Sequence, residues 1–312
     1  MKQYLDILRD VYENGIWKEP AREGMPRTKE VFCRSMRFDL SKGFPLLTTK
    51  KMFTKAIVTE LLWFLRGGTN IKYLVDNGNK IWIDDAYKFY KRRGGKMNKT
   101  EWLEAVKAGK PEDITSADIA GVYSEQCGYV GRIYGSQWRN FGSDPFLKTL
   151  GFDQIRYVIH ALKNRPNERY HIIDAWNPID YLRNKKNAAL PACHVFYQFC
   201  VREGKLDMMM LQRSCDTMLG VPFDLAMCGL LLHLICLEVG LEPGEFVWVG
   251  NSVHLYENHL EQAAEQLNRE PLPLCQIKIN KKDNLEDYEL SDIEFVNYQS
   301  HPAIKAPLSV GV

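Results

Sequence analysis

Cys193 is the residue around which this sequence offers the most chemistry. It ends the run Ala189-Leu190-Pro191-Ala192-Cys193, just before an apolar, aromatic-rich stretch that continues from His194 to Phe199. A thiol at the start of a core strand can face a cleft, where its thiolate could act as a nucleophile. Most free cysteines behave as small buried apolar residues, however, and the chain has eight of them. Position alone leaves both roles open for Cys193.

A second polar stretch, Gln212-Arg213-Ser214-Cys215-Asp216, follows later in the chain and leads into Leu219-Gly220-Val221-Pro222-Phe223-Asp224. It combines a guanidinium, a hydroxyl, two carboxylates and a glycine within one expected strand and one helix start. A core segment does not need this much polar chemistry. We therefore expect the two stretches to belong to one active site.

Glu60 is the one carboxylate in the nearly all-apolar helix expected over residues 56–65. Burying an ionised, unpaired carboxylate costs several kcal/mol, so Glu60 must be partnered, protonated or functional. Perturbed carboxylates are frequent in active sites, and structural pairing is the alternative.

The elements that must position these residues follow from the hydrophobic pattern. Helical spacing predicts helices over residues 2–14, 69–77, 99–108, 155–162 and 257–267. Residues 223–239 are apolar all round, which predicts a centrally buried helix. Strands are expected over residues 31–40, 172–176, 194–201, 206–211, 246–249, 274–279 and 291–296, with a hairpin turn at Glu203-Gly204. Residues 88–128 are more polar and are expected to be a surface insertion in a single domain that spans 1–312.

Composition excludes several classes of function. The 312 residues include 45% hydrophobic and 26% charged residues, and the net charge is +2. This small charge gives no basis for a nucleic-acid groove or a basic membrane face, so any phosphate should be met by a few placed arginines. The N-terminus lacks the apolar run of a signal peptide, and the cysteines have no paired spacing. We expect a cytoplasmic protein with free thiols and no bound metal.

With these stretches in view, the chain resembles the thymidylate synthase superfamily over nearly its whole length outside 88–128. The matching runs are Gly43-Phe44-Pro45-Leu46-Leu47-Thr48-Thr49-Lys50, Glu60-Leu61-Leu62-Trp63-Phe64-Leu65, Tyr134-Gly135-Ser136-Gln137-Trp138-Arg139, Ala175-Trp176-Asn177-Pro178, Cys193-His194, Gln212-Arg213-Ser214-Cys215-Asp216 and His254-Leu255-Tyr256. The resemblance implies an α+β fold with a large mixed sheet packed by helices around a buried central helix.

The resemblance also implies a reaction. Cys193 would add to C6 of a pyrimidine nucleoside monophosphate, which turns C5 into a nucleophile toward 5,10-methylenetetrahydrofolate. Glu60 would be the acid and base, in one network with Tyr134 and His194. The implied nucleotide contacts are Arg22, Gln212, Arg213, Ser214, Asp216, His254, Tyr256 and, from the second subunit of a homodimer, Arg169. The implied folate contacts are Trp82, Asp216, Leu219, Gly220 and Phe223, and the C-terminal tail would close over the folate.

Asp224 is the largest departure from the synthase pattern, because synthases that act on uridylate carry Asn after Pro-Phe. A carboxylate accepts from the amino group of cytosine and opposes O4 of uracil. This substitution is what the cytidylate hydroxymethylases of the superfamily look like, in which water captures the methylene intermediate. We therefore expect 5-hydroxymethylation of CMP or dCMP, with tetrahydrofolate as the second product. An alternative role for Asp224 is a helix N-cap without contact to the base.

Two other functions stay open at this point. One is C5 methylation of dUMP or dCMP of the thymidylate synthase type, with dihydrofolate as product. The other is an inactive nucleotide- or RNA-binding relative, which the intact set Cys193, Glu60, Arg213 and Asp216 disfavours. Smaller departures are Tyr170, Asp174 and Ala192, and also Arg132, which with Ile83 and Asp85 is expected to alter the lining of the site.

Overall fold

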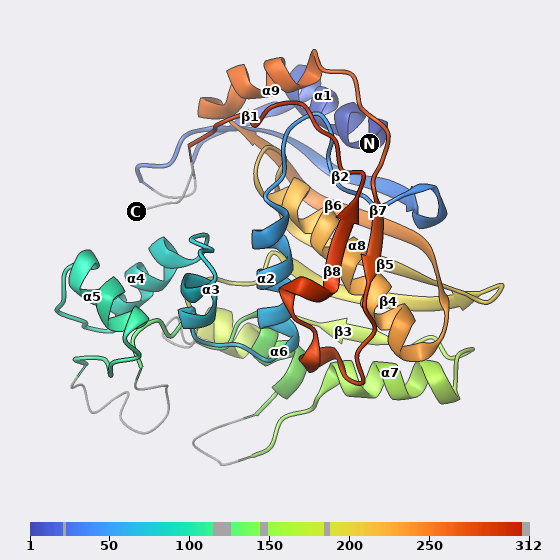
Figure 1. The fold of residues 1–312 in the computed structure, drawn as a ribbon. Helices are drawn as coiled ribbons and strands as arrows, with labels where there is room; N and C mark the ends of the chain where they lie inside the picture. Colours follow the sequence, from blue (N-terminus) through green and yellow to red (C-terminus); the bar gives the residue numbers. More distant parts are fainter. Residues whose placement is uncertain (21–22, 115–125, 144–148, 184–187, 308–312) are drawn as a thin grey trace. The chain divides into compact units, whose positions relative to one another are not determined.

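The computed structural model describes residues 1–20, 23–114, 126–143, 149–183 and 188–307 (Figure 1). The chain divides into two units. The first unit contains Met1–Ile57, Leu162–His171 and Cys193–Val312, and the second contains Val58–Ala161 and Ile172–Ala192. Both units are assembled from stretches that are distant in the sequence, so neither corresponds to the insertion expected at 88–128.

A mixed sheet forms the framework of the first unit. Its strands are β1 (Ile16–Lys18), β2 (Thr28–Asp39), β6 (Glu242–Tyr256), β5 (Lys205–Asp216) and β4 (His194–Arg202), which pair in this order. The β5–β6 pair is parallel and the other pairs are antiparallel. This arrangement confirms the expected α+β class with a large mixed sheet.

The two sides of the sheet differ in burial because side chains alternate along each strand. Tyr197, Met210, Trp248 and Met36 lie in register across β4, β5, β6 and β2, and all are buried. Their neighbours along the strands are only half buried or exposed. One side of the sheet therefore belongs to the core.

The helix α8 (Gly220–Val239) packs on β5 and β6 and fills this core. Most of its side chains are buried on every face, which confirms the centrally buried helix expected from residues 223–239. By length and composition it could cross a membrane, but 72% of its most apolar window is buried inside the protein. Gly240 ends it in the left-handed conformation, with φ 74°, which glycine adopts without steric cost.

The first unit is completed by short elements. They are α1 (Lys2–Asn14), η1 (Leu40–Lys42), η3 (Glu257–His259), α9 (Leu260–Leu267), η4 (Leu285–Asp287), η5 (Leu290–Asp292) and the antiparallel pair β7 (Gln276–Ile279) and β8 (Ile293–Val296). Each predicted helix or strand of this part is present. The strands β5 and β6 run further than predicted, and so His254 and Tyr256 lie within β6 itself rather than after it.

The second unit is mainly helical. It contains most of α2 (Thr54–Leu65) and of α7 (Gln154–Asn164), and also α3 (Lys72–Asp76), α4 (Ile83–Arg92), α5 (Lys99–Lys107), α6 (Tyr134–Asn140), the short strand β3 (Ile172–Asp174) and the π-helical turn η2 (Ile179–Arg183). The helices α4 and α6 were not predicted, because both are short and rich in polar residues.

The described part of residues 88–128 has a small core of its own. Phe89, Tyr90 and Trp102 are fully buried. The Arg93 guanidinium forms an ion pair with Glu112 at 2.5 Å, and their side chains are 0% and 5% exposed. It also lies over the ring of Phe89, at 4.6 Å from the centroid. The polar composition therefore reflects an amphipathic, packed segment rather than a purely solvated one.

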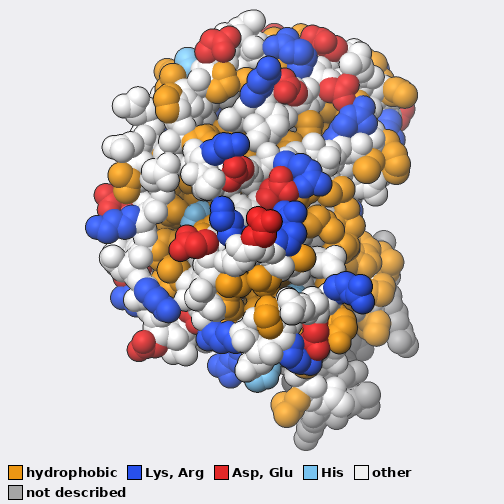
Figure 2. Space-filling model, turned by 90° about the vertical axis from the view of Figure 1, so that its right-hand side faces the viewer, with side chains coloured by type: hydrophobic (Ala, Val, Ile, Leu, Met, Phe, Trp, Pro, Cys, Tyr) orange, Lys and Arg blue, Asp and Glu red, His pale blue; other side chains and the backbone are white. Residues whose placement is uncertain are grey.

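The surface carries charges of both signs. Figure 2 shows lysines and arginines interspersed with aspartates and glutamates, as a net charge of +2 suggests. The described residues include no group of histidine, cysteine, aspartate or glutamate side chains that could hold a metal ion.

Candidate functional site

The two polar stretches of the sequence lie on adjacent strands of the first unit. Cys193 immediately precedes β4 and is partly exposed. Its carbonyl oxygen accepts a hydrogen bond from the backbone N–H of Arg213 at 2.9 Å. The pair His194–Gln212 follows in register, before a bulge in β4. The thiol-bearing residue and the guanidinium-bearing residue are thus backbone neighbours at the end of one strand pair.

Asp224 lies in the first turns of α8 and contacts polar side chains from both strands. Its Oδ1 is 3.0 Å from Nε2 of His194, and its Oδ2 accepts from the Gln212 amide at 2.6 Å. The N-cap of α8 is Leu219, without a side-chain capping bond. The N-cap role for Asp224 is therefore wrong. The carboxylate belongs to a side-chain network that also includes Cys193's neighbour, His194.

Two aromatic residues extend this network into the core. The hydroxyl of Tyr197 lies 2.7 Å from Nδ1 of His194, and the indole N–H of Trp248 donates to Oε1 of Gln212 at 2.8 Å. Both aromatic side chains are fully buried. Sequence reasoning missed them because they occupy ordinary core positions of β4 and β6. Only the register of the strands shows that their polar atoms meet His194 and Gln212.

Asp216 organises the connection between β5 and α8, where Leu219 and Gly220 lie. Its Oδ1 accepts from the backbone N–H groups of Met218 at 2.9 Å and Leu219 at 3.2 Å. Both hydrogen bonds end on the same oxygen. Oδ2 therefore keeps acceptor capacity, which is the chemistry that a donor group on a ligand would need.

Lys50 and Tyr4 form hydrogen bonds to the backbone of the same connection between β5 and α8. Lys50 donates its ammonium N–H to the carbonyl of Met218, and the Tyr4 hydroxyl donates to the carbonyl of Thr217 at 2.7 Å. Lys50 is 5% exposed. Burial lowers the pKa of its ammonium group to about 8, and the negative charge of Asp216 partly offsets this effect.

His254 and Tyr256 lie next to Asp216 across the sheet. His254 is in register with Asp216, and its carbonyl oxygen accepts from the backbone of Thr217 at 2.9 Å. Its Nδ1–H donates to the carbonyl of Ser252 at 3.1 Å. The rings of His254 and Tyr256 meet edge to face at 5.2 Å. The structure therefore brings these two residues to the same end of the sheet as the polar stretch on β5.

Glu60, Trp82 and Tyr134 form a group in the second unit. The indole N–H of Trp82 donates to Oε1 of Glu60 at 2.5 Å, and Glu60 is 9% exposed. Trp82 and Tyr134 meet edge to face, with 6.3 Å between the ring centroids. Glu60 is thus a partnered carboxylate, and its action together with Cys193 stays a prediction.

The remaining predicted contact residues lie on β5, on α8 and on the loop after α7. Ser214 is a half-buried residue of β5, and Phe223 lies in α8. Arg169 is exposed on the loop after α7, where its carbonyl accepts from the Gln198 amide at 2.9 Å. Arg22 lies outside the described residues, as does the end of the C-terminal tail.

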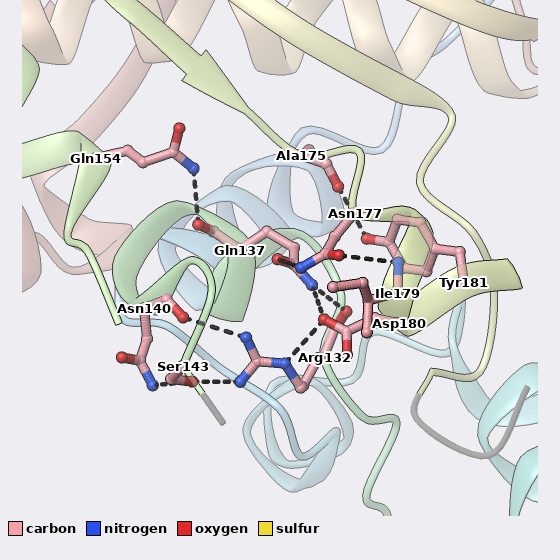
Figure 3. A network of polar contacts seen from close by, with 10 residues as sticks. All are labelled: Arg132, Gln137, Asn140, Ser143, Gln154, Ala175, Asn177, Ile179, Asp180 and Tyr181. Carbon is pink, nitrogen blue, oxygen red and sulfur yellow. Dashed lines mark hydrogen bonds and ion pairs between the residues drawn. The ribbon is translucent and has the colours of Figure 1, made fainter. Parts of the chain in front are cut away.

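Arg132, one of the departures from the superfamily pattern, has a structural explanation (Figure 3). Its Nε donates to Oδ2 of Asp180 at 2.9 Å, and the same oxygen accepts from the Gln137 amide at 2.8 Å. Its terminal nitrogens donate to the hydroxyl of Ser143 and, at 3.3 Å, to the carbonyl of Asn140. The side chains of Arg132 and Asp180 are 11% and 6% exposed. The guanidinium is thus engaged on all three nitrogens within its own unit, which weakens its expected role in lining the site.

Asp174 is a second departure with a local role. Its carboxylate accepts from the backbone N–H of Trp176 at 2.8 Å. Its backbone N–H donates to Oε1 of Gln154 at 2.8 Å, and its carbonyl oxygen accepts from the Gln154 amide nitrogen at 2.7 Å. Burial raises the pKa of Asp174. The residue therefore supports the turn after β3.

All eight cysteines are free, as their unpaired spacing predicts, but they differ in environment. Burial raises the pKa of Cys236 to about 12 and of Cys127 and Cys275 to about 11. Burial, and then the charge of Asp224, raise the pKa of Cys215 and Cys228 further. Cys193 is partly exposed, and Cys33 and Cys200 are exposed.

The chain is similar to known proteins along nearly its whole length. A sequence profile described as thymidylate synthase matches residues 2–310. Thymidylate synthases from Francisella tularensis subsp. holarctica, strains FTNF002-00/FTA, OSU18 and LVS, are each 43% identical over 320 aligned residues, which cover 99% of this chain and 100% of theirs. The family match spans the strands that carry Cys193 and Arg213 as well as the helix that carries Asp224. The chain therefore belongs to the thymidylate synthase family, whose members are one-carbon transferases.

Proposed function

We propose that this protein is a C5 methyltransferase of the thymidylate synthase type, which converts dUMP and 5,10-methylenetetrahydrofolate to dTMP and dihydrofolate. The full-length match to relatives named thymidylate synthase carries this proposal. The placement of Cys193 beside Arg213 supports it. The similar proteins favour C5 methylation over the hydroxymethylation expected from Asp224, because each of the relatives compared is named thymidylate synthase.

The proposed reaction assigns a role to each part of the site. The Cys193 thiolate adds to C6 and makes C5 a carbon nucleophile, which attacks the folate methylene group. Loss of the C5 proton and cleavage of the bond to the folate nitrogen leave an exocyclic methylene at C5, while Cys193 is still bonded to C6. A hydride from the folate reduces this methylene, so that the folate is oxidised to dihydrofolate, and the thiolate then leaves C6. Arg213 holds the phosphate of the nucleotide and favours the thiolate by its charge.

The hydrogen-bonding groups between β5 and α8 also suit the folate. The pterin ring carries N–H and amino donors, and Asp216 keeps acceptor capacity on Oδ2 while Oδ1 caps the turn. Leu219, Gly220 and Phe223, at the start of α8, would contact the ring system. In the second unit, Trp82 would contact the folate and Glu60 would move protons.

Asp224 decides how the base is read. An ionised carboxylate accepts from N3–H of uracil and opposes O4, whereas with cytosine it accepts from the amino group and opposes N3. Each base thus offers one match and one mismatch. Asp224 therefore does not by itself exclude dUMP, provided that O4 meets another donor.

Cytidylate hydroxymethylation is the second candidate function. Asp224 favours it, since a carboxylic acid there could both accept from the amino group of cytosine and donate to N3. The two candidates differ in substrate, in product mass and in the folate released, so one assay separates them.

The test is to incubate the purified protein with 5,10-methylenetetrahydrofolate and each of dUMP, UMP, dCMP and CMP, with mass analysis of nucleotide and folate. We expect dUMP to gain a methyl group while dihydrofolate forms in equal amount. Turnover of dCMP or CMP to a hydroxymethyl product, with tetrahydrofolate released, would replace this proposal by the second candidate. The absence of any turnover would contradict both.

We also propose that the protein is a homodimer in which Arg169 reaches the phosphate of the partner's nucleotide. Phe196, Leu211 and Val249 lie in register on the side of the sheet away from α8, where they are only half buried. A hydrophobic surface of this kind is typical of a protein interface. Figure 2 shows hydrophobic side chains exposed toward one margin of the molecule.

Arg169 is tied to the same side of the sheet. Gln198, whose amide donates to the carbonyl of Arg169, is two residues beyond Phe196 on β4 and so shares its side. A second subunit on this side would meet Arg169 directly.

A further inference from the structure

The helix α6 is too short to hold its place by itself. It contains seven residues, Tyr134–Asn140, and its N-cap residue Ile133 makes no side-chain hydrogen bond. Isolated helices of this length are not stable in water. The position of α6, and with it that of Tyr134 in its first turn, must therefore be set by contacts with neighbouring segments.

Arg132 binds both ends of this helix (Figure 3). Its carbonyl oxygen lies before the first turn and accepts from the Gln137 amide at 2.9 Å. Its guanidinium reaches the last turn, where it donates to the carbonyl of Asn140 at 3.3 Å and to the hydroxyl of Ser143. A guanidinium has five N–H donors on three nitrogens, whereas a lysine has a single nitrogen and could not reach the same set of acceptors.

Asp180 joins the same helix to the π-helical turn η2. One carboxylate oxygen, Oδ2, accepts from Nε of Arg132 at 2.9 Å and from the Gln137 amide at 2.8 Å. Asn177, just before that turn, donates to Oε1 of Gln137 at 3.3 Å. Gln137 and Asp180 are 0% and 5% exposed, so bulk water does not compete for these contacts. An ion pair and two amide hydrogen bonds therefore fix α6 to residues 177–180.

The first turn of α6 also packs directly on the end of α2, the helix that carries Glu60. A Cβ atom at Gly135 would lie 2.8 Å from the backbone nitrogen of Gly68, just after α2, so that only glycine permits this approach. Tyr134 meets Trp82 edge to face at 6.3 Å, and Trp82 donates to Glu60 at 2.5 Å. A displacement of α6 would therefore move Tyr134 relative to this group.

We propose that Arg132 and Asp180 are positioning residues, which hold Tyr134 through α6 against Glu60 and Trp82. The two side chains act on the helix and not on the substrate. The consequence for turnover rests on the proposed function and on the place that the family resemblance implies for Tyr134 in the network of Glu60. Displacement of an active-site group by about 1 Å can cost about 10²-fold in rate.

The first test is independent of turnover. The rings of Trp82 and Tyr134 are in contact, so the ¹H and ¹⁵N chemical shifts of the Trp82 indole N–H report where the Tyr134 ring lies. This resonance is assigned by comparison with Trp82→Phe, and Tyr134→Leu gives its value without the Tyr134 ring. We expect the resonance to move toward that value in Arg132→Lys, because one ammonium group cannot replace the guanidinium.

A second variant approaches the same ion pair from its other partner. Asp180→Asn keeps an acceptor oxygen for Arg132 and Gln137 but removes the charge that strengthens the bond to the guanidinium. We expect the Trp82 resonance to move in the same direction and by less. An unchanged resonance in Arg132→Lys or, if that variant does not fold, in Asp180→Asn would overturn the proposal.

Arg93→Lys is the matched control. Arg93 is likewise buried in the second unit, where it forms an ion pair with Glu112, and the two side chains are 0% and 5% exposed. This pair joins the end of α4 to the segment after α5 rather than to α6. We expect Arg93→Lys to lower stability and to leave the Trp82 resonance in place. Movement equal to that in Arg132→Lys would overturn the proposal.

The second test is a double-mutant cycle on the turnover of dUMP. We expect Arg132→Lys to lower kcat about 10- to 100-fold, but less than about 3-fold in a Tyr134→Phe protein, where the positioned hydroxyl is already absent. A loss of stability alone would lower kcat by the same factor in both proteins, and that result would overturn the proposal. Movement of the Trp82 resonance in a protein that turns over none of the four nucleotides would contradict the proposed function alone.

Discussion

At the scale of single residues, Cys193 differs from the other seven cysteines in its environment. In the structure five are buried, and of the three that are not, Cys193 is the one whose carbonyl oxygen accepts from the backbone N–H of Arg213 in the polar stretch of β5. Because reaction requires a thiolate, burial makes the five poor nucleophiles.

We predict that Cys193→Ala lowers turnover by at least about 10³-fold, because no covalent addition to C6 can then occur, while nucleotide binding is largely kept. The measurements are steady-state kinetics and calorimetric titration with dUMP. Cys33→Ser is the matched control, since it also removes a thiol that is not buried. Near-normal turnover of Cys193→Ala would exclude the covalent mechanism.

At the scale of elements, the predictable parts were those with a dense apolar pattern. The unbroken apolar run of α8 and the apolar, aromatic-rich stretch of β4 are visible in the sequence, because buried elements contain few polar residues. The ends of β5 and β6 were missed because they carry Gln212 to Asp216 and His254, mostly polar residues that interrupt the apolar pattern of the strands. The network of Asp224 could not be predicted either, since it depends on the register between β4, β5 and α8.

The connection between β5 and α8 provides a prediction about pH. The folded protein releases the Lys50 proton near pH 8, whereas an unfolded lysine keeps it until about pH 10.4. Between these values the unfolded state binds more protons, so the free energy of unfolding must rise with pH. Below pH 8 both states are protonated and the cost of burying the charge is fully present.

We predict that the difference in free energy of unfolding between the unaltered protein and Lys50→Met rises by about 2.5 kcal/mol from pH 8 to pH 10.5, in favour of the unaltered protein. Groups common to both proteins cancel in this difference. Denaturant unfolding at a series of pH values measures it, and the lost hydrogen bond to Met218 adds only a constant. A difference that is flat with pH would show that Lys50 is not buried as a cation.

At the scale of the whole molecule, the two sides of the sheet differ in their surroundings. One side packs on α8, and the other carries half-buried apolar residues together with the loop of Arg169. The sequence predicted both the mixed sheet and a shared Arg169 through family resemblance. Its hydrophobic pattern alone could not separate the core side from the side proposed as an interface, since both are apolar.

The proposed sharing of Arg169 between subunits leads to a prediction for mixed dimers. If Arg169 is shared, we expect an Arg169→Ala chain and a Cys193→Ala chain to be inactive alone, because each change removes one residue from every site. In a mixed dimer the site with an intact Cys193 receives Arg169 from the other chain and is complete. We expect mixing under subunit exchange to restore roughly a quarter of the unaltered activity, since half of the dimers are mixed and each has one complete site.

The matched control is Arg213→Ala mixed with Cys193→Ala. These two residues are backbone neighbours in one chain, so no site becomes complete and no activity returns. If the Arg169 pair also stays inactive although exchange is demonstrated by mass spectrometry, Arg169 acts within its own subunit or not at the phosphate.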